Sequence, residues 1–340
     1  MSQDGKPHVV IAGAGAMGCF VGGLLASGGL RVSMLARART EAEIRGHGLT
    51  LTDFCGMATP VSLGAIGVAE KPEVLARGDV ILVCVKPKDS AAIAALIDAH
   101  AKPDACIISL QNGLNNAEVL RSFLPGRDLR SGVVPFNVVP MGQGVFHRVS
   151  GGDIVIEAGD GRPAEQLSVP HLPIAETRDI ASVQWGKFLI NLNNALNALS
   201  GLPLRQQLQD RRWRRLMADQ WQEALKVLNR AGIVPASTLP VSAAMVPTVL
   251  RLPGVLFRRI AANMLLIDPQ VRTPMAMDLM AQRPTEIEDL QGVIVQMGFD
   301  LGIATPINAL IRDLIKTAEI AGEGLPDLPA ASITAELQQK

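Results

Sequence analysis

The sequence contains no tyrosine, four cysteines and no long apolar run. The missing tyrosine removes one common general acid from consideration. The cysteines (Cys19, Cys55, Cys84 and Cys106) show no C-x-x-C spacing and do not cluster with histidine. Cys84 and Cys106 stand inside apolar runs, so we predict that they are buried thiols of a reducing compartment.

Membrane-spanning and secretory signals are also lacking. The apolar stretches fall well short of the roughly 20 residues that a membrane helix needs. Residues 1–7 are polar and do not form a basic-then-apolar leader. The sequence therefore predicts a cytoplasmic protein without a membrane partner.

No excess of charge is present, since lysine plus arginine and aspartate plus glutamate each number 32. Nucleic-acid binding needs a basic surplus or patch, so we expect no such partner. The basic clusters at residues 211–215 and 258–259 are the local exceptions, and we interpret them as solvated helix faces. The five histidines show no ligand spacing, so no metal site is expected.

Short apolar runs alternate with helical patterns in the first half of the chain. This alternation is typical of a doubly wound, Rossmann-type α/β domain with a parallel sheet buried on both faces. Weaker runs near residues 142–157 and 171–175 predict further edge strands, with an antiparallel arrangement left open. The main predicted strands are residues 9–12, 31–35, 80–85 and 105–110.

Strand-like runs vanish after about Thr177, and the periodicity becomes helical. A chain of 340 residues is long enough for two domains. We predict a Rossmann domain over residues 1–178 and an all-helical second domain over residues 179–340. The predicted helices of the second domain are residues 181–199, 211–231, 285–301 and 307–319.

A glycine-rich loop joins the first predicted strand to the helix expected over residues 16–27. It has the pattern G-x-G-x-x-G, in which the glycines permit a tight turn, close approach of a pyrophosphate, and packing of the helix on the sheet. The helix N-terminus adds unpaired N–H groups for the phosphates. The predicted cofactor-binding residues of this loop are Gly13, Ala14, Gly15, Ala16, Met17 and Gly18.

The second strand lacks the acidic residue that binds the ribose of NAD at its end. Arg37 and Arg39 follow it instead. A guanidinium matches phosphate geometry with several donors, so Arg37 is the predicted ligand of a 2′-phosphate and the predicted cofactor is NADPH.

Two more loops follow predicted strands, at the sheet edge where open α/β sheets bind ligands. One carries Lys86, a candidate for a cofactor phosphate or an anionic substrate. The other carries Asn112, a candidate hydrogen-bond partner of ribose or nicotinamide. Each is also compatible with an ordinary loop residue.

The most informative helical segment of the second half runs from Trp185 to Leu199. At about 100° per residue, Lys187, Asn191 and Asn194 share one narrow face of an otherwise apolar helix. A buried lysine is costly unless it is paired or functional, and its pKa moves readily. The alternative is a solvent-facing stripe. Glu286, in the first turn of another helix, fits either a plain N-terminal charge or a functional acid.

Taken in order, these motifs resemble the ketopantoate reductase family. The resemblance rests on GAGAMG, Lys86 after VILVCV, Gln111-Asn112-Gly113, Trp185-x-Lys187-x-x-x-Asn191 and Arg283-x-Thr285-Glu286-Ile287, followed by Gly292 and Gly302-Ile303-x-Thr305-Pro306. It implies NADPH-dependent reduction of 2-dehydropantoate, a 2-oxo acid, to (R)-pantoate in pantothenate and coenzyme A biosynthesis.

The resemblance also implies roles for individual residues. Lys187 matches the family's general acid, Asn191 a substrate-orienting amide, and Glu286 an acid of the catalytic network. Asn112 and Lys86 match loop residues on the cofactor and substrate side. A homodimer is one assembly compatible with the sequence.

Two positions depart from the family pattern. Ala195 stands where many members carry a second asparagine, and Pro274 where many carry a serine. Asn194 and Thr273, each one residue away, are the predicted substrate-binding substitutes. Two alternatives stay open: a reductase or opine-type dehydrogenase for another 2-oxo acid, and a catalytically silent NADP(H)-binding sensor.

Overall fold

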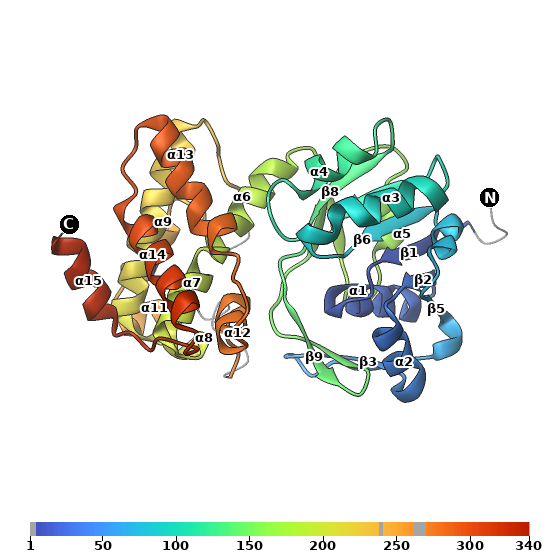
Figure 1. The fold of residues 1–340 in the computed structure, drawn as a ribbon, viewed down its shortest axis with the longest axis horizontal. Coiled ribbons are helices and arrows are strands. Elements are labelled where there is room, and N and C mark those ends of the chain that lie inside the picture. The colour runs from blue at the N-terminus through green and yellow to red at the C-terminus, as the bar shows by residue number, and fades with distance from the viewer. Residues whose placement is uncertain (1–4, 238–240, 262–269, 340) are drawn as a thin grey trace. The chain divides into compact units, whose positions relative to one another are not determined.

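The computed structural model describes residues 5–237, 241–261 and 270–339 (Figure 1). The chain divides into two compact units, Met1–Ala181 and Ser182–Lys340. In the part of the chain described, no helix is long and apolar enough to cross a membrane.

The first unit is built on an eight-stranded sheet with the order β12-β11-β8-β7-β6-β1-β2-β5. The strands from β8 to β5 run parallel, and β11 pairs antiparallel with β8. The chain winds outward from β1 in both directions, which is the doubly wound arrangement predicted from the sequence. The strands are β1 (His8–Ala12), β2 (Arg31–Leu35), β5 (Ile66–Ala69), β6 (Val80–Val83), β7 (Cys106–Ser109), β8 (Leu129–Val133), β11 (Ile154–Glu157) and β12 (Ile174–Thr177).

Both faces of this sheet are covered, which explains the continuous apolar runs. Val9 and Ile11 pack into the core on the side of α1 (Ala16–Ser27), whereas Val10 and Ala12 pack with α3 (Ser90–His100) and α4 (Asn116–Phe123) on the opposite side. Alternate residues of one strand point to opposite faces, so each strand contributes to two cores.

A second sheet of four strands, in the order β4-β3-β10-β9, packs against α1 and was not expected from the sequence. Its strands are β3 (Leu49–Asp53), β4 (Ala58–Val61), β9 (Val138–Gly142) and β10 (Val145–Arg148). The remaining short elements of this unit are α2 (Ala38–His47), α5 (Pro163–Leu167), η1 (Leu63–Ala65), η2 (Pro72–Arg77) and η3 (Pro87–Asp89).

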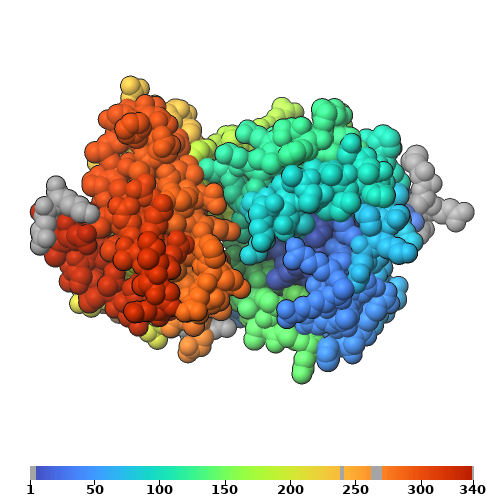
Figure 2. All heavy atoms as spheres, in the orientation of Figure 1, coloured from blue at the N-terminus to red at the C-terminus, as the bar shows by residue number. Residues whose placement is uncertain are grey.

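The described residues of the second unit are helical and contain no strand. Helix α9 contacts α7, α8, α10, α13, α14 and α15, and is therefore the central element. The helices are α6 (Ile180–Asn191), α7 (Asn193–Ser200), α8 (Leu204–Gln209), α9 (Arg211–Arg230), α10 (Val246–Arg251), α11 (Gly254–Ile260), α12 (Pro274–Met280), α13 (Val293–Leu301), α14 (Pro306–Ala321), α15 (Ala330–Gln339) and the π-helix η5 (Glu288–Gly292). Within each unit, side chains fill the gaps between the ribbons (Figure 2).

Three sequence expectations need correction. The helix predicted over residues 181–199 divides at Leu192 into α6 and α7. Cys84 and Cys106 are only half-buried, although burial raises the pKa of each thiol to about 12. The basic cluster at residues 211–215 is not a uniformly solvated face, because Arg214 is 1% exposed.

Arg214 joins the ends of two helices. Its guanidinium donates to the carbonyls of Leu208 and Gln209 at the end of α8, and of Leu250 and Leu252 at the end of α10, over 2.9–3.1 Å. A cation is favoured at helix C-termini, where carbonyls lack backbone donors.

Replacing Arg214 with methionine should therefore destabilise the second unit. The change leaves two buried and two partly buried carbonyls without this donor, and we expect a loss of about 3 kcal/mol or more in the free energy of unfolding. This corresponds to a fall in Tm of roughly 6–12 °C. Thermal denaturation followed by circular dichroism measures it. Arg212→Met is the matched control, because the Arg212 side chain is 75% exposed; equal Tm values for the two variants would contradict the assignment.

Candidate active site

The carboxyl ends of β1, β2, β6 and β7 lie level with one another. Ala12 pairs with Leu35 on one side and Val83 on the other, and Val83 pairs with Ser109. The loops that follow these strands therefore emerge together at one edge of the sheet. This edge carries Gly13–Gly18, Arg37, Lys86 and Asn112, all predicted to bind the cofactor.

The three glycines of the loop between β1 and α1 differ in their surroundings. Gly13 has φ +111°, and a Cβ there would lie 2.6 Å from Val85 Cγ1. A Cβ at Gly18 would collide with the Gly13 carbonyl oxygen. At Gly15, by contrast, a Cβ would meet nothing within 4 Å. The protein thus needs Gly13 and Gly18 for its own packing, whereas the space at Gly15 fits the close approach of a pyrophosphate.

Arg37 lies at the N-cap of α2, and its side chain is 86% exposed. Its guanidinium Nη2 is 3.2 Å from the Asp89 carboxylate, in the turn that follows Lys86. Sequence reasoning missed Asp89, because it stands 52 residues from Arg37. The arginine is available to a phosphate, which would compete with this carboxylate.

Lys86 and Asn112 are exposed on neighbouring loops. Between them, the buried side chain of Gln111 donates to the Val85 carbonyl over 3.2 Å and to Ser90 Oγ over 2.9 Å, and accepts from Ser109 Oγ. Gln111 therefore fixes the two loops to each other. The sequence motif contained this residue, but its pattern gave no sign of that function.

In the second unit, Lys187 lies on α6 and is half-buried. Burial lowers the pKa of its ammonium to about 8, and the negative charge of Glu286 opposes this shift. The adjacent Gly186 admits the Ala236 backbone, whose N–H donates to the Ser182 carbonyl over 2.8 Å. In the folded protein the charge of Glu286 thus acts on the Lys187 ammonium, although the two residues are 99 positions apart in the sequence.

Glu286 is exposed and lies two residues before the start of the π-helix η5. Its segment is attached to α14 at two points. The Thr285 N–H donates to Glu319 Oε1 over 2.6 Å, and Lys316 forms an ion pair with Glu288. Such one-turn π-helices are frequent at functional sites.

Asn191 and Asn194 are both half-buried, on α6 and α7 respectively. Leu192 lies between the two helices and has helical backbone angles. Ala195, the first departure from the family pattern, is fully buried.

Thr273 has a different environment from the one expected for a substrate ligand. It is 5% exposed, its hydroxyl donates to the Asn194 carbonyl over 3.1 Å, and its N–H donates to Asn197 Oδ1 over 3.0 Å. These bonds connect the start of α12 to α7. The hydroxyl is engaged in this connection and is not presented as a substrate donor.

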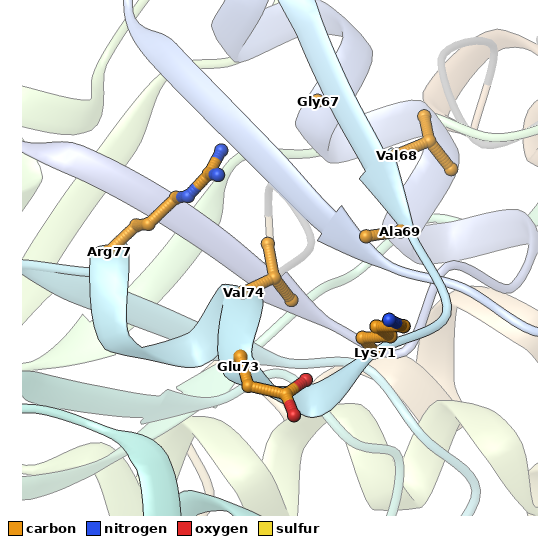
Figure 3. Close-up of a pocket in the computed structure, with 7 residues that line it drawn as sticks. All are labelled: Gly67, Val68, Ala69, Lys71, Glu73, Val74 and Arg77. Carbon is orange, nitrogen blue, oxygen red and sulfur yellow. The ribbon is translucent and has the colours of Figure 1, made fainter.

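A pocket of about 510 Å³ lies beside the edge strand β5 and η2 (Figure 3). None of the residues predicted to act on cofactor or substrate lines it, so we do not assign it to the reaction. Its lining residues are Gly67, Val68, Ala69, Lys71, Glu73, Val74 and Arg77.

A Rossmann sheet with a glycine-rich loop, followed by a helical unit in which Glu286 influences the pKa of a half-buried lysine, is consistent with an oxidoreductase. The sequence profile described as Ketopantoate reductase PanE/ApbA matches residues 9–161, and that of Ketopantoate reductase PanE/ApbA C terminal matches residues 179–319. The chain belongs to the ketopantoate reductase family.

Individual relatives agree with this assignment. A 2-dehydropantoate 2-reductase of Halobacterium salinarum is 28% identical over 324 residues, which cover 93% of this chain and 100% of that protein. A crystal structure of a PanE/ApbA family ketopantoate reductase from Ralstonia eutropha has a TM-score of 0.75 at 28% identity, over 93% of this chain and 99% of that chain. A D-mandelate dehydrogenase structure with NADH and anilino(oxo)acetate has a TM-score of 0.74 at 22% identity, over 93% and 99% of the two chains, and shows a shared fold alone.

The contrast between the glycines gives a test of the cofactor loop. We expect Gly15→Ala to keep the wild-type Tm but to weaken nicotinamide dinucleotide binding at least about tenfold, because its methyl group enters only the space left for the pyrophosphate. Gly13→Ala should lower the Tm, since alanine is strained at a positive φ. Calorimetric titration and thermal denaturation measure the two effects. Undiminished binding by Gly15→Ala would rule out a pyrophosphate at this position.

Proposed function

We propose that this protein catalyses the NADPH-dependent reduction of 2-dehydropantoate to (R)-pantoate, the step expected in pantothenate and coenzyme A biosynthesis. The observation that carries the proposal is the half-buried Lys187, whose pKa is lowered to about 8 and whose charge interacts with Glu286. Binding of a cofactor alone requires neither residue, so this pair counts against a silent sensor.

The residues at the sheet edge fit the cofactor. Gly15 leaves room for the pyrophosphate, the N-terminus of α1 offers N–H groups, and Arg37 supplies a cation for the 2′-phosphate. When bound, the nicotinamide supplies the hydride for the substrate carbonyl carbon.

Lys187 acts as the general acid. As negative charge develops on the carbonyl oxygen, the Lys187 ammonium donates a proton to that oxygen. A pKa of about 8 allows the group to remain largely protonated at neutral pH and to be a stronger acid than an exposed lysine. The amides of Asn191 and Asn194 orient the substrate, and Glu286 holds the ammonium in its charged form.

Lys187→Ala tests the general acid. We expect NADPH affinity within about twofold of wild type and kcat lower by roughly 10²–10⁴, the usual range for a lost proton donor. In the wild-type enzyme, kcat should fall as the pH rises through about 8, because only the protonated amine donates. Steady-state kinetics across pH 6–10 measure this. A variant with ordinary turnover, or one whose lost turnover accompanies unfolding, would refute the role.

Arg37→Ala tests the cofactor preference. The wild-type protein should bind NADPH more tightly than NADH, and the substitution should narrow the difference by about 1–3 kcal/mol, the scale of a hydrogen bond to a charged group. Fluorescence titration with both cofactors provides the comparison, and Arg39→Ala is the neighbouring control. Equal affinities of the wild-type protein for NADPH and NADH would exclude this cofactor choice.

The identity of the substrate can be tested by removing the terminal hydroxyl of 2-dehydropantoate. Ala195 offers no donor and the Thr273 hydroxyl is engaged with the Asn194 carbonyl, so the amides of Asn191 and Asn194 are left to recognise the substrate. We expect kcat/KM for 2-dehydropantoate to exceed that for its analogue without the hydroxyl by roughly 5–150-fold, the value of one hydrogen bond.

A ratio near one would replace 2-dehydropantoate by another 2-oxo acid and would leave the reductase chemistry standing. A panel of 2-oxo acids assayed by NADPH oxidation identifies that substrate. A homodimer remains a prediction from the sequence.

A further inference from the structure

The junction between α6 and α7 is held by two buried amides. The carbonyl oxygen of Leu192 accepts a hydrogen bond from Gln220 Nε2 at 3.2 Å and another from Gln291 Nε2 at 2.8 Å. Gln220 belongs to α9 and Gln291 to η5. The two side chains therefore bring separate elements to the single turn that follows Asn191.

The two glutamines belong to different segments, and only one of these segments contains Glu286. Gln291 stands in the π-helix that directly follows Glu286 and Ile287, so its bond fixes the Glu286 segment to the C-terminal end of the Lys187 helix. The bond from Gln220 fixes the same helix end to α9, which does not contain Glu286.

The burial of the Gln291 side chain suggests that this residue does more than fill space in the core. Its side chain is 0% exposed, and within the described residues its amide oxygen is buried without a hydrogen-bond partner. Burying a polar oxygen without a partner is unfavourable, and an apolar side chain would avoid this cost. The contribution of the glutamine is thus its single N–H bond to Leu192.

We propose that Gln291 is a positioning residue, whose hydrogen bond to the Leu192 carbonyl sets the Glu286 carboxylate at its distance from the Lys187 ammonium. The catalytic meaning of this contact rests on the proposed function, but the contact itself does not. The attachments of Thr285 and Glu288 to α14 fix the other side of the segment.

This contact has an electrostatic consequence. Among the described residues, Glu286 is the charged group whose field acts on Lys187, and it raises the lysine pKa against the effect of burial. If the Glu286 segment moves away, this support weakens and the Lys187 pKa falls.

The experiment compares Gln291→Met with Gln220→Met. Methionine keeps most of the volume of glutamine and removes the amide, so both variants lose one bond to the same carbonyl. The Lys187 pKa is read directly by nuclear magnetic resonance of the full-length protein with labelled lysine side chains. Lys187→Arg assigns the signal, and Glu286→Gln gives the pKa without the carboxylate.

We expect Gln291→Met to lower the Lys187 pKa by roughly 0.5 or more, toward the value in Glu286→Gln, and Gln220→Met to leave it at the wild-type value. The pH at which kcat declines should shift by the same amount. If Gln291→Met does not fold, Gln291→Asn, whose amide is one methylene too short, replaces it with the same expectation.

Identical lysine titrations in the Gln291 and Gln220 variants would overturn the proposal. So would a Lys187 pKa in Gln291→Met equal to that of the wild type. These titrations contain no substrate, and failure of the proposed function would instead appear as absence of 2-oxo acid turnover by the wild-type protein.

Discussion

The burial of one ammonium group is the constraint around which the second unit is organised. Desolvation pushes Lys187 toward its neutral form, and the carboxylate of Glu286 counteracts it. The two groups belong to segments far apart in the chain, so their separation depends on everything that holds η5 against α6. Helix α9 provides the common support. Its buried Glu223 accepts hydrogen bonds from the backbone N–H groups that begin α14. Helix α14 in turn holds the Glu286 segment through Glu319 and Lys316, so polar interactions connect α9, α14 and that segment.

Much of the fold follows from local patterns. The bounds of α1 and β2 agree with the sequence prediction, because a glycine loop and an uninterrupted apolar run mark these elements clearly. The four-stranded second sheet could not be predicted in this way. Strand β4, with the sequence ATPV, is short and weakly apolar. It pairs with the neighbouring β3, which in turn pairs with the distant β10, and both β3 and β4 pack on α1. The division of the helix at Leu192 is equally non-local, since the amides that bind this carbonyl come from 28 and 99 residues away.

For the candidate site, the sequence identified candidate residues better than it identified the groups with which they interact. It singled out Lys187 and Glu286 and related them through the family resemblance, whereas the field between them is visible only in the structure. Thr273 illustrates the limit. A threonine next to an expected serine position suggested a substitute donor, but its hydroxyl lies within reach of the Asn194 carbonyl, 79 residues away. Arg214 is a second example. A basic cluster in the sequence predicts solvent exposure, and the carbonyls that bind the buried Arg214 are visible only in the structure.

The pairing of Arg37 with Asp89 has a consequence for cofactor choice. The guanidinium that would select NADPH belongs to the loop after β2, whereas the carboxylate that competes for it belongs to the turn after β6. With the role proposed for Arg37, cofactor choice would depend on two positions in separate loops. Under that proposal, a substitution at position 89 would change how readily Arg37 accepts a phosphate, although it alters no residue of the glycine loop.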